Sequence, residues 1–253
     1  MALMSVPEKH HYLPEFFMRR WADAEGLVRE YRRPRRDLTS KRKAPAATGW
    51  IRNLYANENK ADPIERQALE MIFMSDLDGK AADALSYIEE YRLKPPEWEL
   101  RAPWSRFLEL MIGSRRLSEA INWMHWRVHQ LDKLEFGFIS GDLPLMISNG
   151  LGHARSFLML PIGPTRLFIA SPDPNLINAF TTQYPHALET AINDAIARQS
   201  THILIARDDR LREFVDERFR KGRAGKKSRV LDYITWNSPL RDLRPMPSWM
   251  PTP

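Results

Sequence analysis

The 253-residue sequence predicts an α+β fold, in which a helical N-terminal half packs on a mostly antiparallel sheet with C-terminal helices. Apolar residues recur at helical spacing over about 1–132. Over about 133–253, short apolar runs are separated by Gly and Pro, which is typical of an antiparallel meander. Because no Gly/Ser-rich linker divides the halves, we expect a single domain over 1–253, with two packed subdomains as the alternative.

The first half predicts several helices around one strand and one arm. Residues 10–22 suit a helix that begins near Pro14, since proline lacks only an N–H that a first turn does not use. The alternating residues 26–31 predict a strand, and the basic residues 32–48 predict a loop or mobile arm. Further helices are expected from Asp62, which with Pro63 and Glu65 forms a helix start, and over 79–93, 103–112 and 115–131.

The second half predicts short strands followed by helices. The apolar runs that we interpret as strands are 136–140, 144–148, 156–162, 165–171, 202–207 and 229–236. Helical patterns occupy about 174–181, 185–199 and the segment from Asp208 to about Lys221.

Composition excludes several classes of protein. The chain has no cysteine, so disulfides, thiolate zinc sites and a cysteine nucleophile are excluded. The N-terminus carries no apolar run of the signal-peptide kind, and no apolar stretch is long enough to span a bilayer, so we expect a cytoplasmic protein without membrane contact. Motifs of P-loop proteins, nicotinamide enzymes, zincins and α/β-hydrolases are missing from the sequence.

Positive charge is concentrated in two segments. The first basic strip, residues 29–43, has eight basic residues against two acidic ones, and the second, residues 218–229, has seven and no acid. Such segregation favours contact with RNA or DNA, whereas a solvated surface is the alternative. Tyr31, Trp50 and Tyr55 flank the first strip and could stack on bases. The predicted phosphate contacts are Arg32, Arg33, Arg35, Arg36, Lys41, Arg42, Lys43, Arg220, Lys221, Lys226 and Lys227.

Three polar groups are candidates for chemistry. His10 and His11 precede the first predicted helix, where imidazoles could act as general acid and base or simply pack and cap. Asp142 lies in the turn 140–144, where it could be catalytic or could only form the turn. His125 and His129 would share a helix face as half of a metal site, but no acid at the right spacing completes it. We therefore assign no metal ligands, and a divalent cation stays open as a cofactor.

Several short motifs, taken in order, resemble a bacterial family of uncharacterised proteins, domain-of-unknown-function family 4238. The opening is His10-His11-Tyr12-Leu13-Pro14 followed by Phe16-Phe17 and Trp21, and the later ones are Phe138-Ile139-Ser140-Gly141-Asp142-Leu143-Pro144 and Pro161-Ile162-Gly163-Pro164. The stretch from Asn175 to Arg207 is also similar to the family's end, whereas Gly141 departs from the family's usual turn. The resemblance implies no settled activity. It suggests that His11 and Asp142 could meet in one pocket, for hydrolysis or phosphodiester chemistry, or for a structural hydrogen bond.

Two functions follow nearly equally from these patterns. The first is a nuclease-like hydrolase acting on nucleic acid, with His10, His11 and Asp142 as catalytic residues and the basic strips as the phosphate-binding surface. The second is a non-catalytic module that binds nucleic acid or a protein partner. A metal-dependent enzyme that uses His125 and His129 on small substrates is a third hypothesis. The sequence does not identify any protein partner.

Overall fold

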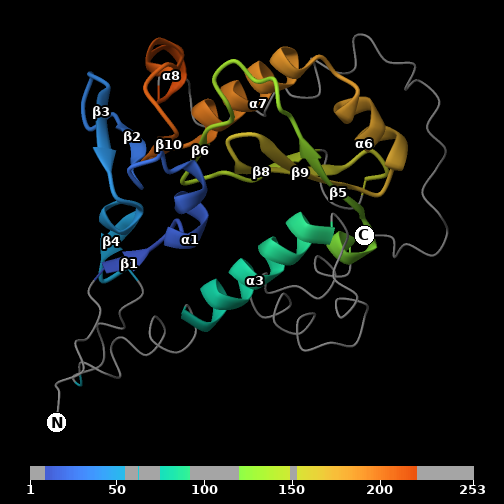
Figure 1. The fold of residues 1–253 in the computed structure, drawn as a ribbon, viewed down its shortest axis with the longest axis horizontal. Coiled ribbons are helices and arrows are strands. Elements are labelled where there is room, and N and C mark those ends of the chain that lie inside the picture. Colours follow the sequence, from blue (N-terminus) through green and yellow to red (C-terminus); the bar gives the residue numbers. More distant parts are fainter. Residues whose placement is uncertain (1–8, 55–61, 63–74, 92–119, 149–152, 221–253) are drawn as a thin grey trace.

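The computed structural model describes residues 9–54, 62, 75–91, 120–148 and 153–220 (Figure 1). Its strands form three sheets with antiparallel pairing throughout the described part. Sheet A pairs β1 (Lys9–His11) with β4 (Trp50–Arg52). Sheet B has the order β3 (Thr39–Lys43), β2 (Val28–Arg32), β10 (Leu204–Ala206) and β6 (Ser140–Gly141). Sheet C has the order β5 (His125–Gln130), β9 (Arg166–Ser171), β8 (Phe157–Gly163) and β7 (Met146–Ser148).

The helices are distributed over both halves of the chain. The N-terminal ones are α1 (Glu15–Met18), the 3-10 turns η1 (Arg19–Trp21) and η2 (Pro45–Ala47), and α3 (Ser75–Tyr91). The C-terminal ones are α6 (Pro174–Thr181), α7 (Pro185–Gln199) and α8 (Arg212–Arg218). In the described residues, none of these helices is long and apolar enough to cross a membrane.

The predicted helical N-terminal half is wrong. Residues 9–54 hold four strands, and the predicted mobile arm 32–48 contains strand β3 and turn η2. Of the helix predicted over 115–131, residues 120–123 are helical and strand β5 follows, in which Val128 is buried between the exposed Arg127 and the partly buried His129. Strand β3 was not predicted because its sequence is basic and polar. An edge strand can direct Lys and Arg toward solvent and needs few apolar residues. Most of the helix predicted from Asp62, the helix at 103–112 and the strand at 229–236 lie outside the described residues.

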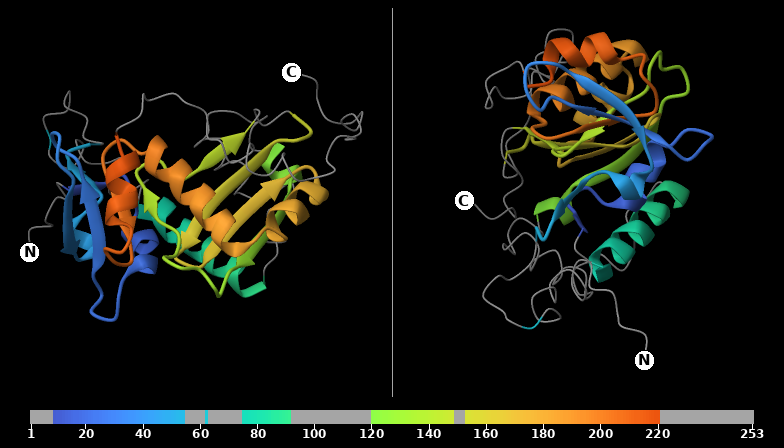
Figure 2. Two further views of the ribbon diagram at one scale, coloured as in Figure 1. Left: turned by 90° about the horizontal axis from the view of Figure 1, so that it is seen from above. Right: turned by 90° about the vertical axis from the view of Figure 1, so that its left-hand side faces the viewer.

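The two larger apolar clusters of the described residues lie on opposite faces of sheets B and C. Helices α6, α7 and α8 cover one face, and α1, η1 and α3 cover the other (Figure 2). Strand β10 contributes to both, since Leu204 and Ala206 belong to the first core whereas Ile205 belongs to the second. A strand buried on both faces is apolar without interruption, which explains the buried run Ile203-Leu204-Ile205-Ala206.

Residues 135–139 connect sheet C to sheet B without pairing as a strand. The carboxylate of Glu189 in α7 accepts hydrogen bonds from the backbone N–H groups of Glu135 at 3.0 Å, Phe136 at 2.8 Å and Gly137 at 2.5 Å. One turn later, Asn193 accepts from Ile139 N at 2.9 Å and donates to Gly137 O at 3.0 Å. These helix side chains take the backbone groups that a strand partner would take, so only Ser140 of the predicted strand 136–140 is in a strand.

Hydrogen bonds from outside α7 also hold this connecting segment. Trp21 Nε1 donates to Phe138 O at 2.7 Å, and Phe138 N donates to Pro164 O at 2.7 Å. Gly137 has a φ of +84°, and a Cβ there would lie 3.0 Å from Pro164 O, so both its conformation and the close approach require glycine.

We expect Glu189→Ala to lower the free energy of unfolding by about 3 kcal/mol or more, because it leaves three backbone donors without an acceptor. Urea denaturation monitored by circular dichroism measures the change. Glu213→Ala, an exposed glutamate on α8, is the matched control and should change stability by less than about 0.5 kcal/mol. Equal effects of the two substitutions would contradict this role of Glu189.

Candidate functional site

Asp142 lies at the end of sheet B, where three chain segments meet. Gly141 pairs with Leu204 in the ladder between β6 and β10, and Asp142 N donates to Ile203 O at 3.3 Å. On the other side of β10, Tyr31 pairs with Leu204. The register therefore brings the turn after β6, the residues before β10 and the end of β2 to one edge.

The Asp142 carboxylate is enclosed by hydrogen-bond donors. Its Oδ1 accepts from the backbone N–H groups of Thr201 at 3.0 Å, His202 at 3.0 Å and Ile203 at 3.2 Å. Its Oδ2 accepts from Thr201 Oγ1 at 2.7 Å. Burial by itself would raise the pKa of Asp142, but the hydrogen bonds from Thr201, His202 and Ile203 outweigh it and hold the pKa below its usual value. The carboxylate is therefore ionised at neutral pH.

The imidazole of His202 contacts this buried carboxylate and is itself exposed to solvent. Its side chain is 65% exposed, whereas that of Asp142 is 6% exposed. The Nδ1 atom lies 3.1 Å from Asp142 Oδ2 and 2.7 Å from Thr201 Oγ1. Because an ionised carboxylate only accepts hydrogen bonds, Nδ1 carries the proton, and Nε2 of the neutral ring is left with a lone pair. This is the arrangement of an oriented general base.

Tyr12 adds a protonated hydroxyl next to this pair. Its ring centroid lies 6.3 Å from that of His202, with the ring planes tilted by 54°. Burial raises the pKa of Tyr12 to about 12; the nearby Arg32 lowers it, whereas the negative charges of Asp142 and Glu30 raise it. Tyr12 therefore stays a hydrogen-bond donor at neutral pH.

The buried carboxylate of Glu30 binds Lys43 and Arg32, and Arg32 lies beside Tyr12. Lys43 Nζ lies 3.0 Å from Glu30 Oε1, and an Arg32 terminal nitrogen lies 3.1 Å from Oε2, which also accepts from the Thr48 hydroxyl. Burial would raise the pKa of Glu30, but the hydrogen bonds from Thr48 and Lys43 and the charge of Arg32 bring it below the usual value. Arg32 remains partly exposed and so offers cationic N–H groups at the edge of this cluster.

The two histidines predicted as catalytic, His10 and His11, lie in strand β1. His10 is fully buried, so a substrate does not reach it in this conformation. His11 is half-buried, and burial lowers its pKa, while the charge of Glu15 raises it. Of the opening motif, Tyr12 is close enough to Asp142 for that carboxylate to raise its pKa.

Much of the first basic strip has structural partners. Arg33 is buried and donates to Phe219 O at 3.0 Å and Asp216 O at 2.7 Å, whereas Arg42 pairs with Asp23 at 2.5 Å. Arg220 from the second strip donates to Arg33 O at 2.7 Å. The exposed members of the first strip that are not used in these contacts are Arg35, Arg36 and Lys41.

Of the remaining predicted contacts, one residue is buried, one is partly exposed and the others lie outside the described residues. Tyr31 is fully buried and its hydroxyl donates to Asp208 O at 3.1 Å, so it does not stack on a base. Trp50 is partly exposed and lies under the Lys9 ammonium, 5.0 Å from the ring centroid. Tyr55, Lys221, Lys226 and Lys227 lie outside the described residues.

His125 and His129 lie on strand β5 instead of a helix. At about 3.3 Å per residue, their Cα atoms are roughly 13 Å apart, too far for both to bind one ion. The part of the chain that the structure describes contains no group of three or more His, Asp or Glu side chains placed to hold a metal. The metal-dependent hypothesis therefore loses its proposed ligands.

Residues 9–113 match the family model described as "Protein of unknown function (DUF4238)". This match supports the predicted family over residues 9–113. The DUF4238 match includes Tyr12, Glu30, Arg32 and Lys43, while Asp142 and His202 lie beyond it, so the turn motif at 138–144 stays a prediction. No curated protein and no solved structure matches the chain.

Sequence reasoning found Asp142 but missed Thr201 and His202. Their signal was the polar pair that directly precedes the buried run of β10, where a strand end commonly places functional groups. Tyr12 was not predicted either, because the adjacent His10 and His11 were the residues of this motif expected to act as acid and base.

We expect Asp142→Asn to be less stable than the wild type at pH 7, with a difference that disappears on acidification. The folded-state pKa of Asp142 is depressed, so its stabilisation is full above the unfolded-state value near 3.8 and is lost as pH falls through the lower folded value. Urea denaturation of both proteins between pH 2.5 and 7 measures the difference. Asp132→Asn, at an exposed site, is the control, and a wild-type-minus-variant difference that does not narrow as the pH falls from 7 to 2.5 would contradict the assignment.

Proposed function

We propose that the protein is a nuclease-like phosphodiester hydrolase in which His202 is the general acid–base. The observation that supports this function is an exposed imidazole whose Nδ1 lies 3.1 Å from a buried carboxylate, with Tyr12 and Arg32 beside it. The absence of cysteine supports a cytoplasmic location for this activity.

Each residue of the cluster has a distinct role in the proposed reaction. His202 Nε2 takes a proton from water as the water oxygen forms a bond to phosphorus. The bond from phosphorus to the ester oxygen breaks, and that oxygen leaves with the proton that the imidazolium returns. Asp142 holds the ring orientation and stabilises the imidazolium, and Arg32 and the Tyr12 hydroxyl donate to the non-bridging oxygens.

The β2–β3 hairpin supplies the surface that would hold the nucleic acid. Arg32 lies at the end of β2, and the exposed Arg35, Arg36 and Lys41 follow it on the same hairpin, at the edge of sheet B (Figure 1). Cationic groups in this order would lead a phosphate backbone toward Arg32.

A non-catalytic module that binds nucleic acid or protein is the second candidate, and the environment of Asp142 favours it. Three consecutive backbone N–H groups bond to this carboxylate, an arrangement that by itself accounts for an aspartate as the support of the turn before β10. In this case the same hairpin binds its partner and His202 is only its exposed neighbour.

We expect His202→Ala to reduce cleavage of end-labelled RNA or DNA at least about 100-fold while the melting temperature is retained, because general acid–base catalysis contributes about that much or more. The assay uses single- and double-stranded substrates with Mg²⁺ or EDTA, which also reports on a divalent cation. His186→Ala is the matched control, since His186 is an equally exposed imidazole near a carboxylate, with Nδ1 3.4 Å from Glu135.

Two results of that assay would redirect the assignment. Loss of cleavage in His11→Ala, with full activity in His202→Ala, would move the base to His11. A salt-sensitive gel shift without cleavage in the wild type would support the binding module instead.

Replacing Arg35, Arg36 and Lys41 together by Glu should weaken nucleic-acid binding and reduce the slope of log K against log salt by about one unit for each phosphate group that the variant no longer binds. Fluorescence anisotropy with a labelled oligonucleotide, over a range of salt concentrations around the physiological one, measures both. Arg198, Arg212 and Lys133 replaced by Glu give a charge-matched control on other exposed surfaces. Unchanged affinity in the hairpin variant would exclude the hairpin as the binding surface.

A further inference from the structure

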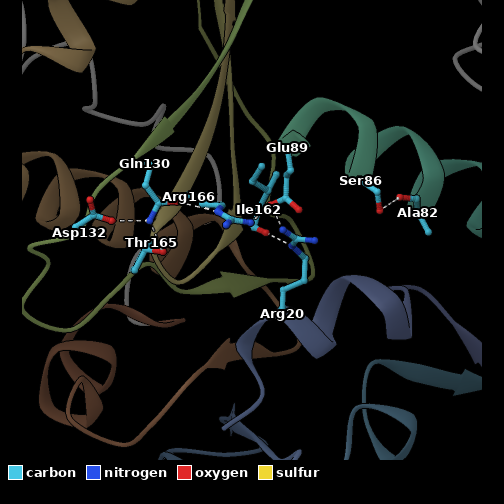
Figure 3. Close-up of polar contacts among 9 residues, drawn as sticks. All are labelled: Arg20, Ala82, Ser86, Glu89, Gln130, Asp132, Ile162, Thr165 and Arg166. Atoms are coloured by element: carbon cyan, nitrogen blue, oxygen red, sulfur yellow. Dashed lines mark hydrogen bonds and ion pairs between the residues drawn. The ribbon is translucent and has the colours of Figure 1, made fainter. Parts of the chain in front are cut away.

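Two arginines from distant segments converge on a single carboxylate between sheet C and α3. Arg20 comes from η1, Arg166 begins β9, and Glu89 lies in the last turn of α3 (Figure 3). Arg166 NH1 lies 2.9 Å from Glu89 Oε1, and Arg20 NH2 donates to the same oxygen atom. None of these residues belongs to the cluster around His202.

Each guanidinium is held in place by a neutral acceptor that is independent of Glu89. Arg20 Nε donates to Ile162 O, and Arg166 Nε donates to Gln130 Oε1 at 2.8 Å. Gln130 is itself fixed, because its Nε2 donates to Asp132 Oδ1 at 2.9 Å and Thr165 Oγ1 at 3.1 Å (Figure 3). The terminal nitrogens of both arginines are therefore directed to one point before any anion arrives.

The charges at this point are not balanced. Glu89 is the one carboxylate that the described structure pairs with these two cations, so the trio carries an excess positive charge. Burial, with a smaller contribution from the charge of Arg166, lowers the pKa of Arg20 to about 10. Arg166 is 45% exposed and Glu89 is 14% exposed, so the cluster is reached from solvent.

We propose that Arg20 and Arg166 form a binding site for a small oxyanion, a phosphate or carboxylate group, and that Glu89 fills it in the unliganded protein. Two guanidinium groups fixed toward one point match the several acceptor oxygens of such a group. The ligand takes the terminal N–H groups that Glu89 Oε1 now accepts. Its binding therefore breaks the ion pairs of Glu89 with Arg20 and Arg166, while Ile88 keeps the last turn of α3 packed in the second core. The site is independent of the proposed hydrolase activity.

Isothermal titration calorimetry with inorganic phosphate and with acetate tests the site, and thermal unfolding in the same solutions checks the fold. We expect saturable binding in the wild type, about tenfold weaker binding in Arg166→Gln through loss of a charge-assisted hydrogen bond, and tighter binding in Glu89→Gln through loss of the competing carboxylate. Arg198→Gln, at an exposed arginine paired with Asp194, is the matched control and should bind as the wild type does.

A purely structural ion pair predicts the opposite pattern. In that case Glu89→Gln lowers the melting temperature and neither anion binds saturably to any variant, a result that would overturn the proposal. Equal weakening by Arg166→Gln and Arg198→Gln would also overturn it, since it would indicate nonspecific attraction. The two anions distinguish a phosphate from a carboxylate ligand. His202→Ala should retain the binding, which separates this site from the failure or success of the hydrolase assignment.

Discussion

The hydrogen bonds between helix α7 and the backbone of residues 135–139 are the interaction on which the placement of sheet B and of the candidate site depends. This segment carries the chain from sheet C into sheet B, and its backbone is bound by Glu189 and Asn193 instead of by a strand. Because these two side chains lie one helical turn apart, a rigid helix sets the spacing of the backbone groups that they hold. Trp21 fixes the same segment from the opposite core. The position of sheet B relative to sheet C therefore depends on buried polar contacts as much as on apolar packing.

The geometry of the candidate site depends on the connecting segment 135–139. Asp142 follows the fixed segment by three residues, so its backbone position is restrained by that segment, and the hydrogen bonds from residues 201–203 then hold its carboxylate. Strand β10 then places His202 beside it and β2 places Arg32 across the sheet. Three segments that are far apart in sequence are brought together by one short central strand, whose burial on both faces makes a register shift costly.

Local patterns in the sequence were enough for elements that bury one clear face. The runs at 165–171 and 185–199 correspond to β9 and α7, because an apolar run or a helical stripe of sufficient length determines each. The interpretation of β5 failed because Leu117, Ile121, Met124 and Val128 have helical spacing, whereas the alternation of Trp126 and Val128 only has meaning once β9 lies alongside. Strand β3 was missed for a related reason, since its basic side chains suit an edge that the sequence does not reveal.

The same limit applied to the candidate site. Asp142 could be predicted because Gly141 and Pro144 indicate a turn. Its contact with His202 joins residues sixty positions apart and depends on the pairing of β10 with β6, which the sequence does not show. Charge counting overstated the basic strips, because Arg33, Arg42 and Lys43 neutralise carboxylates or cap backbone carbonyls of the protein itself. A strip of eight basic residues is thus reduced to a few exposed ones on the hairpin.

A comparison of His202 with His186 shows why burial of the carboxylate matters more than exposure of the imidazole. Both rings are about two-thirds exposed and both have an Nδ1 near an acid. The acid nearest to His186 Nδ1 is Glu135 at 3.4 Å, itself 59% exposed, so water competes for that contact. The buried Glu189 lies 3.8 Å from the same nitrogen, which is beyond hydrogen-bond distance, so it does not fix the ring. Asp142 is held by three backbone N–H groups and is almost removed from solvent, so its Oδ2 can impose one tautomer and one orientation on His202. An imidazole becomes an effective base only when such a constraint is present, and within the described residues His202 meets it where His186 does not.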